Sequence, residues 1–171
     1  MSKKEQFPLG FSKIELSLFI SLFIVLIIGA YYVIDPSGEE GDYRNEERLI
    51  EIELLADALH AAYEDSGSIS GVLAGVDDAV ETVQLISNGP GEGKCEERTC
   101  GNQKLPKKNC YANIAGLTAN YIESIPYDPL ADESGVNTGY YVNFTKSTVT
   151  VGACQSDDSA FGLEPTIEIR R

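Results

Sequence analysis

The sequence predicts an α+β protein in which an N-terminal transmembrane helix continues as an amphipathic helix packed on a small antiparallel sheet. Three observations support this prediction. Residues 16–34 carry no charge, residues 43–64 carry apolar side chains at helical spacing, and the C-terminal third contains runs rich in β-branched and aromatic residues. The part after the apolar segment, roughly 130 residues, is long enough to bury a core of its own.

The apolar segment has the length of a membrane-spanning helix. It places 19 uncharged residues in a row, about what is needed to cross the hydrocarbon core. Lys3, Lys4 and Lys13 precede the segment, and this bias predicts a cytoplasmic N-terminus with everything after Ile34 outside. The segment ends in IIGAYYVID, where cleavage by a signal peptidase after Ala30 would put the bulky Ile28 at a position that needs a small residue. An ordinary single-pass anchor is the simplest alternative.

A short motif at the start of this segment argues for more than an anchor. A basic stretch ends in Gly10, Phe11 follows, and Glu15 is the fifth residue after the glycine. This arrangement resembles the class III leader and first helix of type IV prepilins. The resemblance implies that a prepilin peptidase in the membrane cuts after Gly10 and methylates the new N-terminal Phe11. The usual string in that family is close to FTLIEL, and this chain reads FSKIEL, so Lys13 departs from it.

Glu15 has a physical requirement of its own. A carboxylate at the edge of a membrane helix is costly without a partner, and breaking a buried ion pair costs about 3–5 kcal/mol. When such helices bundle, the free amine of Phe11 on a neighbouring subunit is the natural partner, and the pair favours one axial offset. Lys13 is two residues away, and residues at that spacing do not face each other on a helix. We therefore expect Phe11 and Glu15 to act in assembly.

A break and a second helix are expected beyond the membrane. Residues 35–42, DPSGEEGD, contain Pro and Gly and cannot remain regular helix without cost. The step IDP at 34–36 resembles a subgroup of prepilins. Residues 43–64 are predicted to be a helix with Leu49, Ile52, Leu55, Leu59 and Ala62 on its packed face. A solvated face would hold Arg44, Glu46, Glu47, Arg48, Glu51, Glu53, Asp57 and Glu64. The lone His60 is interpreted as a packing or surface residue rather than a ligand.

The rest of the chain predicts loops, short strands and one short helix. DSGSISG and NGPGEG are loops by composition, and AVETVQLIS between them favours a strand, with a helix over VDDAVETVQLIS as the open alternative. A short helix is predicted within 113–123, ended before IPYDP. GYYVNFT and STVTVGA are predicted strands joined at Lys146, and TIEIRR is the last strand. This order is similar to the C-terminal half of many type IV pilins and type II pseudopilins.

The four cysteines are Cys95, Cys100, Cys110 and Cys154. In an exported domain an even count predicts disulfides, and three connectivities are possible. A local loop between Cys95 and Cys100, with Cys110 bonded to Cys154, is slightly preferred. A zinc site is the alternative, but separations of 4, 9 and 43 residues do not match known zinc modules.

Acidic residues dominate the charge. The net charge is −14, and removal of the leader, which holds two lysines and one glutamate, gives −15. Such a surface repels nucleic acid. Asp128, Asp132 and Glu133 share the loop DPLADESG, whose place resembles that of a calcium loop in some pseudopilins. A solvated acidic turn is the simpler interpretation, because the loop lacks EF-hand spacing.

Function is expected to be structural rather than enzymatic. The sequence offers no evident nucleophile with a base, no phosphate loop and no cofactor motif. We expect a cleaved leader (1–10), an assembly helix (11–34), a linker with an amphipathic helix (35–64) and an extracytoplasmic head (65–171, completed by 43–64). The resemblance implies a subunit of a type IV pilus-like filament, first in the inner or plasma membrane and then extracellular at the cell surface. Its partners would be further copies, a prepilin peptidase and an assembly platform.

Two alternatives remain open for this function. Within the same class, the chain would be a pseudopilin of a type II-like secretion system. In another class, it would be a single-pass anchored binding protein that displays its head without polymerising. Leader processing separates the anchored binding protein from the pilin and the pseudopilin, because a plain anchor would retain residues 1–10.

Overall fold

The computed structural model of the chain describes residues 13–34, 36–68, 83–91, 95, 100–101, 103–132, 135–145, 148–158 and 166–171. The predictions made for Gly10, Phe11, Glu133 and Lys146 lie outside these residues. The chain divides into two compact units, Met1–Pro36 and Ser37–Arg171. Each unit is described by itself, and the second is called the head.

The first unit contains the helix α1, Lys13–Ile34. Its stretch Lys13–Tyr31 is long and apolar enough to span a membrane, and none of it is buried within the chain. The hydroxyls of Ser17 and Ser21 donate to the carbonyl oxygens of Ile14 and Leu18, at 3.2 and 2.9 Å. The polar atoms of these serines are therefore satisfied inside the helix, as an apolar environment requires.

The second helix begins earlier than the sequence predicted. Helix α2 spans Pro36–Ser66, so the stretch expected to be a linker is helical from its second residue onward. Proline is tolerated at the first helical position because its missing N–H has no intrahelical partner there. The predicted break is therefore wrong for residues 36–42, and Asp35 lies outside the described residues.

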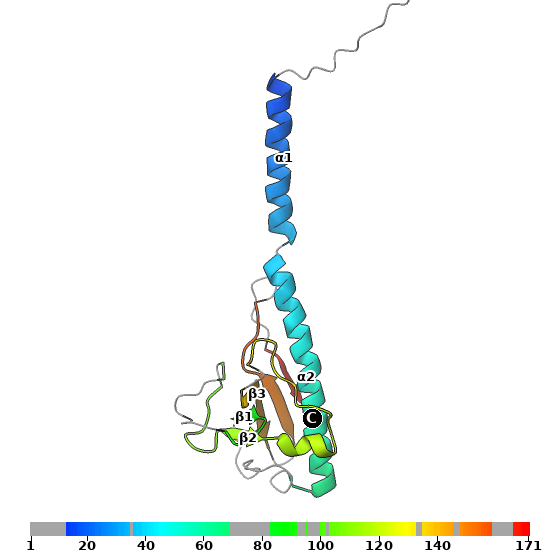
Figure 1. Ribbon diagram of the computed structural model, residues 1–171, viewed down its shortest axis with the longest axis vertical. Coiled ribbons are helices and arrows are strands. Elements are labelled where there is room, and N and C mark those ends of the chain that lie inside the picture. The colour runs from blue at the N-terminus through cyan, green and yellow to red at the C-terminus, as the bar shows by residue number, and fades with distance from the viewer. Residues whose placement is uncertain are drawn as a thin grey trace, which may run out of the picture. The chain divides into compact units, whose positions relative to one another are not determined.

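A five-stranded sheet in the order β2-β1-β3-β4-β5 completes the head (Figure 1). β3 pairs antiparallel with β1 and β4, and β4 pairs antiparallel with β5, but β1 pairs with β2 in parallel. The predicted antiparallel sheet is therefore a mixed sheet. Its strands are β1 (Val83–Ser87), β2 (Tyr111–Asn113), β3 (Asn137–Phe144), β4 (Val149–Ala153) and β5 (Glu168–Arg170).

Most predicted strands are confirmed, and the differences concern short elements. Residues 83–87 form a strand, as favoured over the helix. Strand β2 was not predicted, since its three residues are too short for a pattern. The helix expected within 113–123 is reduced to the 3-10 helix η2, Ala115–Ala119.

The core lies between α2 and one face of the sheet. Ile52, Leu55 and Leu59 are fully buried there together with Tyr140 and Val142. Burying each such side chain contributes about 1.5–3 kcal/mol. Leu49 was predicted to join them, but it is 47% exposed.

Successive residues of β3 point to opposite faces of the sheet. Tyr140 belongs to the core under α2, whereas its neighbour Tyr141 packs with Leu85 and Cys100 in a second, smaller cluster. Both faces of the central strand are thus covered.

Candidate functional site

The predicted assembly site belongs to α1. Glu15 lies in the first turn of this helix, and its side chain is exposed. The partner proposed for it, the amine of Phe11, lies outside the described residues. The pairing of Glu15 with Phe11 therefore stays a prediction.

The head contains a charged cluster that the sequence did not predict. Arg48 was expected on the solvated face of α2, yet its side chain is fully buried. Its Nε donates to Oδ2 of Asp128 at 2.7 Å, and its Nη2 donates to Oδ1 of the same carboxylate at 3.2 Å. The third nitrogen, Nη1, donates to Oδ2 of Asp157 at 2.6 Å. One guanidinium thus joins α2 to two segments that are distant in the sequence.

Helical spacing explains why Arg48 points inward. Ile52, Leu55 and Leu59 follow it by four, seven and eleven residues, so all four lie on one side of α2. That regular spacing was a signal in the sequence, although the charge of Arg48 argued against using it. Hydrogen bonds to the two carboxylates outweigh the effect of burial, so the pKa of Arg48 is raised and the side chain stays charged.

Asp157 holds the segment 154–158, which follows β4, against α2. Arg44 donates to both carboxylate oxygens of Asp157, at 2.9 and 2.8 Å. The side chain of Asn45 donates to the carbonyl oxygen of Asp157 at 2.9 Å and accepts from its N–H at 3.0 Å. Chiefly the hydrogen bond from Arg44, and then that from Arg48, lowers the pKa of Asp157 to about 2. This carboxylate is ionised at any physiological pH.

A glycine allows this close approach. A Cβ at Gly41 would come within 3.0 Å of the carbonyl oxygen of Asp158 and 3.1 Å of the Cβ of Asp157. Glycine in a helix interior costs about 1 kcal/mol relative to alanine. The contact between Gly41 and the segment 154–158 offsets this cost. It explains why this part of the chain is helical although its sequence predicted a break.

Asp128 is oriented by its own loop. Its Oδ1 accepts from the N–H of Leu130 at 2.9 Å, and its carbonyl oxygen accepts from the N–H of Ala131 at 2.7 Å. Gly139 has a φ of 85°, and a Cβ there would come within 2.5 Å of the Cβ of Asp128. This position therefore needs glycine for both its conformation and its packing.

One of the calcium candidates, Asp128, is engaged in an ion pair. Asp128 directs its carboxylate to Arg48, while Glu133 lies outside the described residues. Among the residues that the structure describes, no group of three or more His, Cys, Asp or Glu could hold a metal ion. Asp128 is instead one half of a buried ion pair.

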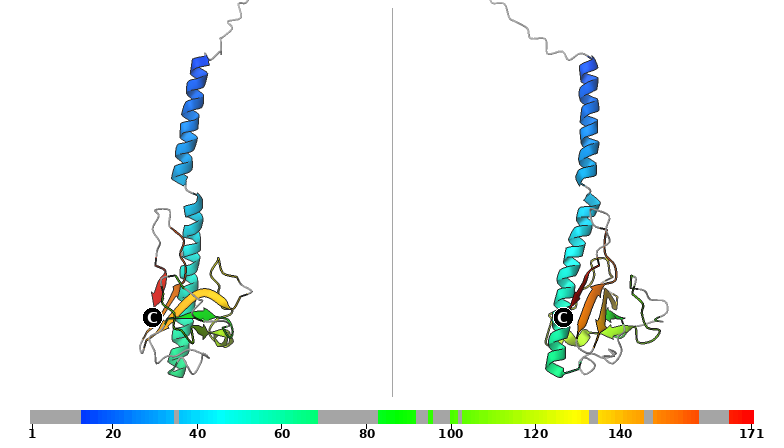
Figure 2. Two further views of the ribbon diagram at one scale, coloured as in Figure 1. Left: turned by 90° about the vertical axis from the view of Figure 1, so that its left-hand side faces the viewer. Right: turned by 180° about the vertical axis from the view of Figure 1, so that it is seen from behind.

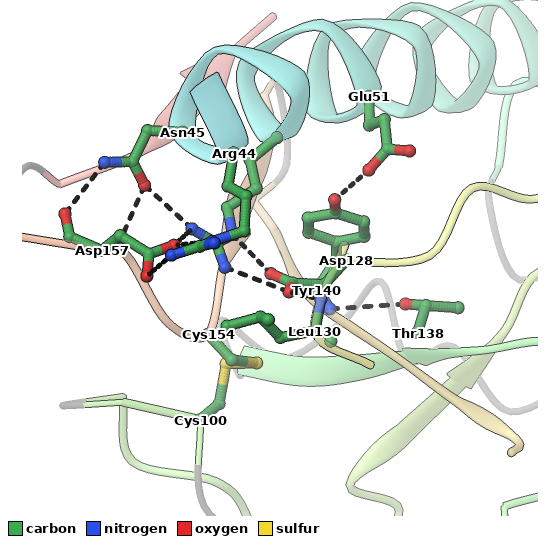
Figure 3. Close-up of polar contacts among 12 residues, drawn as sticks. Arg44, Asn45, Glu51, Cys100, Asp128, Leu130, Thr138, Tyr140, Cys154 and Asp157 are labelled. Carbon is green, nitrogen blue, oxygen red and sulfur yellow. Dashed lines mark hydrogen bonds and ion pairs between the residues drawn. A yellow bond between two sulfur atoms is a disulfide. The ribbon is translucent and has the colours of Figure 1, made fainter. Parts of the chain in front are cut away.

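A second buried contact adjoins the cluster. The hydroxyl of Tyr140 donates to the carboxylate of Glu51, another residue that was expected on the solvated face (Figure 3). Burial raises the pKa of both groups, and the hydrogen bond from Tyr140 only partly opposes this for Glu51. His60, by contrast, lies at the surface, 3.5 Å from Glu64.

Disulfides connect the same region to the sheet. All four cysteines are paired, but as Cys95–Cys110 and Cys100–Cys154. The slightly preferred pairing of Cys95 with Cys100 and Cys110 with Cys154 is wrong. The Cys100–Cys154 bond joins the segment between β1 and β2 to the residue that follows β4, next to the charged cluster. Each of these bonds closes a longer loop than a bond between Cys95 and Cys100 would have closed.

This arrangement can hold segments together rather than carry out chemistry. The ionisable side chains gathered in the described cluster are arginines and carboxylates that neutralise one another, and the described sulfurs are all in disulfides. We compared the chain with protein-family models, with curated proteins and with solved structures, and none of the three comparisons found a match.

Proposed function

We propose that this chain is a structural subunit of a type IV pilus-like filament, processed by a prepilin peptidase and assembled through its N-terminal helix. The observation that carries the proposal is α1, which is apolar on all sides with Glu15 in its first turn, directly after the Gly10-Phe11 motif. We propose no catalytic role for the chain.

The apolar surface of α1 supports a role in assembly. A helix that is hydrophobic all round is stable only in lipid or among other helices. Its carboxylate then needs a cation, and processing after Gly10 would supply one as the amine of Phe11 on a neighbouring copy. A plain anchor needs neither the carboxylate nor the cleavage motif.

The construction of the head supports an exported location. The head contains two disulfides, and such bonds form and persist in oxidising compartments and are rare in the cytosol. They add to an ion-pair cluster that fixes the loop of Asp128 and the segment of Asp157 on the helix α2. Such a head would keep its form outside the cell. The same features would suit a pseudopilin, so the choice between pilus and secretion filament stays open.

The leading test is the mass of the mature chain. We expect intact-mass measurement of membranes or sheared filaments to show a chain that begins at methylated Phe11. Gly10→Val should block cleavage and Gly10→Ala should slow it. Gly29 offers a matched control, because nothing lies within 4 Å of the Cβ that Gly29→Ala would add. Recovery of the full leader on assembled chains would refute the proposal and favour the anchored binding protein.

A second test concerns Glu15. We expect Glu15→Ala to be cleaved normally but to remain in the membrane, because the packed helices need the carboxylate and the peptidase does not. The ratio of sheared filament to membrane protein, measured by immunoblot, reports this. Ser17→Ala in the same helix is the control, and it should assemble normally. Wild-type assembly of Glu15→Ala would show that Glu15 has no pairing role.

A further inference from the structure

Positive charge on the head is concentrated in one segment. Five of the 13 lysines and arginines in the chain lie within residues 94–108. Of these, Lys104, Lys107 and Lys108 are described, and all three are exposed. None of the three forms an ion pair with another described residue, in contrast to Arg44, Arg48 and Arg171. We call residues 103–110 the lysine loop.

Helix α2 presents a surface of the opposite character. Tyr43, Ile50 and Leu54 are 68%, 63% and 47% exposed. They are spaced by seven and four residues, so they form one apolar stripe on the side of α2 that faces away from the core. Acidic residues flank the stripe, Glu46 on one side and Glu47 on the other. Neither glutamate forms an ion pair with another described residue. We call this surface the outer face of α2.

The two surfaces lie on opposite sides of the head. Figure 1, and the view from behind in Figure 2, show α2 along one side of the sheet. Leu105 of the lysine loop packs instead with Leu85 and Tyr141 in the smaller cluster on the other face. The sheet separates them, so the lysine loop cannot neutralise the outer face of its own chain. A contact between two different patches of identical chains is heterologous, and such contacts produce open helical assemblies when the rotation does not close a ring.

We propose that the lysine loop of one copy binds the outer face of α2 on a second copy. Charge complementarity selects this partner, because the loop supplies cations and the outer face supplies carboxylates that form no ion pair with another described residue, beside exposed apolar side chains. Within the loop, Pro106 is half-buried and can contact the stripe of Tyr43 and Ile50. The inference rests on the proposed function, which brings heads together by holding many copies of α1 in one membrane or filament.

Anchoring explains how a modest contact can be effective. An exposed ion pair changes affinity only about 1.5- to 5-fold. Copies held in one membrane meet at a high effective concentration, so several weak contacts suffice. The interaction must also depend on salt, because the Debye length falls from about 10 Å at 0.1 M to about 3 Å at 1 M.

Photo-crosslinking of the full chain in membranes tests the contact without depending on the lysines themselves. Tyr43 is replaced by p-benzoylphenylalanine, and the covalent dimers are digested and identified by mass spectrometry. We expect dimers joined to the peptide that contains residues 103–110, with a yield that falls several-fold at 1 M salt. The same probe at Glu123, which is exposed but lies outside α2, should not capture this peptide. No dimers, or dimers joined only through other peptides, would overturn the inference.

A charge swap makes the test specific. With the probe at position 43, Lys107→Glu with Lys108→Glu should lower the dimer yield at least about fivefold, and so should Glu46→Lys with Glu47→Lys. Combining all four substitutions keeps the net charge of the chain and restores complementarity with the signs exchanged, so the yield should recover. Failure to recover, with all four cysteines still paired by peptide mapping, contradicts the contact.

Net charge alone is controlled by a matched pair of variants. Lys107→Gln with Lys108→Gln changes the net charge by −2, as does Arg170→Glu outside the loop. Only the first should lower the yield. The mature mass is measured on the same samples, so the two proposals fail separately. If the chain keeps its leader but still forms dimers through the lysine loop, only the filament proposal is refuted. If the chain is processed but forms no such dimers, only this contact is refuted.

Discussion

The two long helices of this chain use apolar side chains in opposite ways. In α1, the large apolar residues from Ile14 to Ile28 are each at least half exposed. In α2, Ile52, Leu55 and Leu59 are fully buried, and the same side of the helix holds Arg48. The partner of α2 is therefore inside the chain, whereas the surroundings that α1 requires must come from outside it. The contrast teaches that a charged side chain can belong to the buried face of a helix. It also teaches that exposed apolar side chains can mark a surface that needs a partner outside the chain.

Arg48→Ala tests the buried face most severely. The substitution leaves the carboxylate of Asp128, itself 5% exposed, without its cation in the core. Removing one partner of a buried pair costs about 3–5 kcal/mol, so we expect a loss of this size in the free energy of unfolding. Urea unfolding of the mature chain in detergent, monitored by tyrosine fluorescence, measures it.

Arg44 provides the control for that experiment. Its side chain is 21% exposed, and Asp157 keeps Arg48 when Arg44 is removed. Arg44→Ala should therefore cost clearly less than Arg48→Ala. Equal losses in the free energy of unfolding would indicate that water reaches Asp128 when Arg48 is truncated. Burial would then not make the ion pair of Arg48 more important than that of Arg44.

A matched pair of leucines compares the two helices directly. Leu55→Ala opens a cavity in the head and should cost about 2–5 kcal/mol. Leu22→Ala in α1, where Leu22 is 54% exposed within the chain, should leave unfolding of the head unchanged. Its effect should appear only in filament yield. A similar loss of head stability from both substitutions would show that α1 stabilises the head, contrary to the contrast drawn above.

Spacing in the sequence was sufficient to predict α1, the core residues Ile52, Leu55 and Leu59, and the strands on either side of Lys146. Spacing failed to predict features that depend on contacts between residues far apart in the sequence. Gly41 was taken as a helix breaker because its contact with Asp157 and Asp158 could not be anticipated. The disulfide pairing failed for the same reason, since loop lengths do not determine which cysteines the sheet brings together.

The charged cluster was predictable only in part. Arg48 continues the spacing of the buried residues, so its burial could have been inferred from the pattern. Its two partners could not, because Asp128 and Asp157 are 80 and 109 residues further along the chain. Asp128 was singled out as an acid of interest, but for a metal rather than for an arginine.

The segment held by Asp157 offers a pH-dependent test. Its pKa is lowered to about 2 in the folded chain, chiefly by the hydrogen bond from Arg44, from an ordinary value of 3.8. A lowered pKa stabilises the fold above the unfolded value, and that stabilisation is lost as the pH falls from about 5 to about 1. At about 1.4 kcal/mol per pKa unit, Asp157→Asn should cost about 2 kcal/mol at pH 7.

The difference between wild type and Asp157→Asn should therefore shrink steadily below about pH 5 and vanish only at about pH 1, below the folded pKa. Thermal unfolding at a series of pH values measures it. Glu51, whose pKa is raised chiefly by burial, changes stability in the opposite direction as the pH falls, but it does so in both proteins and cancels in the difference. A difference that stays constant with pH would mean that Asp157 acts through packing and not through its charge.

Arg171 should show the smallest effect and completes the comparison between buried and exposed cations. Its Nη2 lies 2.9 Å from Glu53 and its Nε lies 2.6 Å from Asp57, so on distance alone it resembles Arg48. Its side chain is 34% exposed, however, and its partners are 56% and 58% exposed, so water screens both pairs. We expect Arg171→Ala to lower the free energy of unfolding far less than Arg48→Ala does, and 0.5 M salt to remove most of that loss without reducing the loss at Arg48. A loss at Arg171 as large as that at Arg48 would mean that distance, and not burial, determines what an arginine contributes on α2.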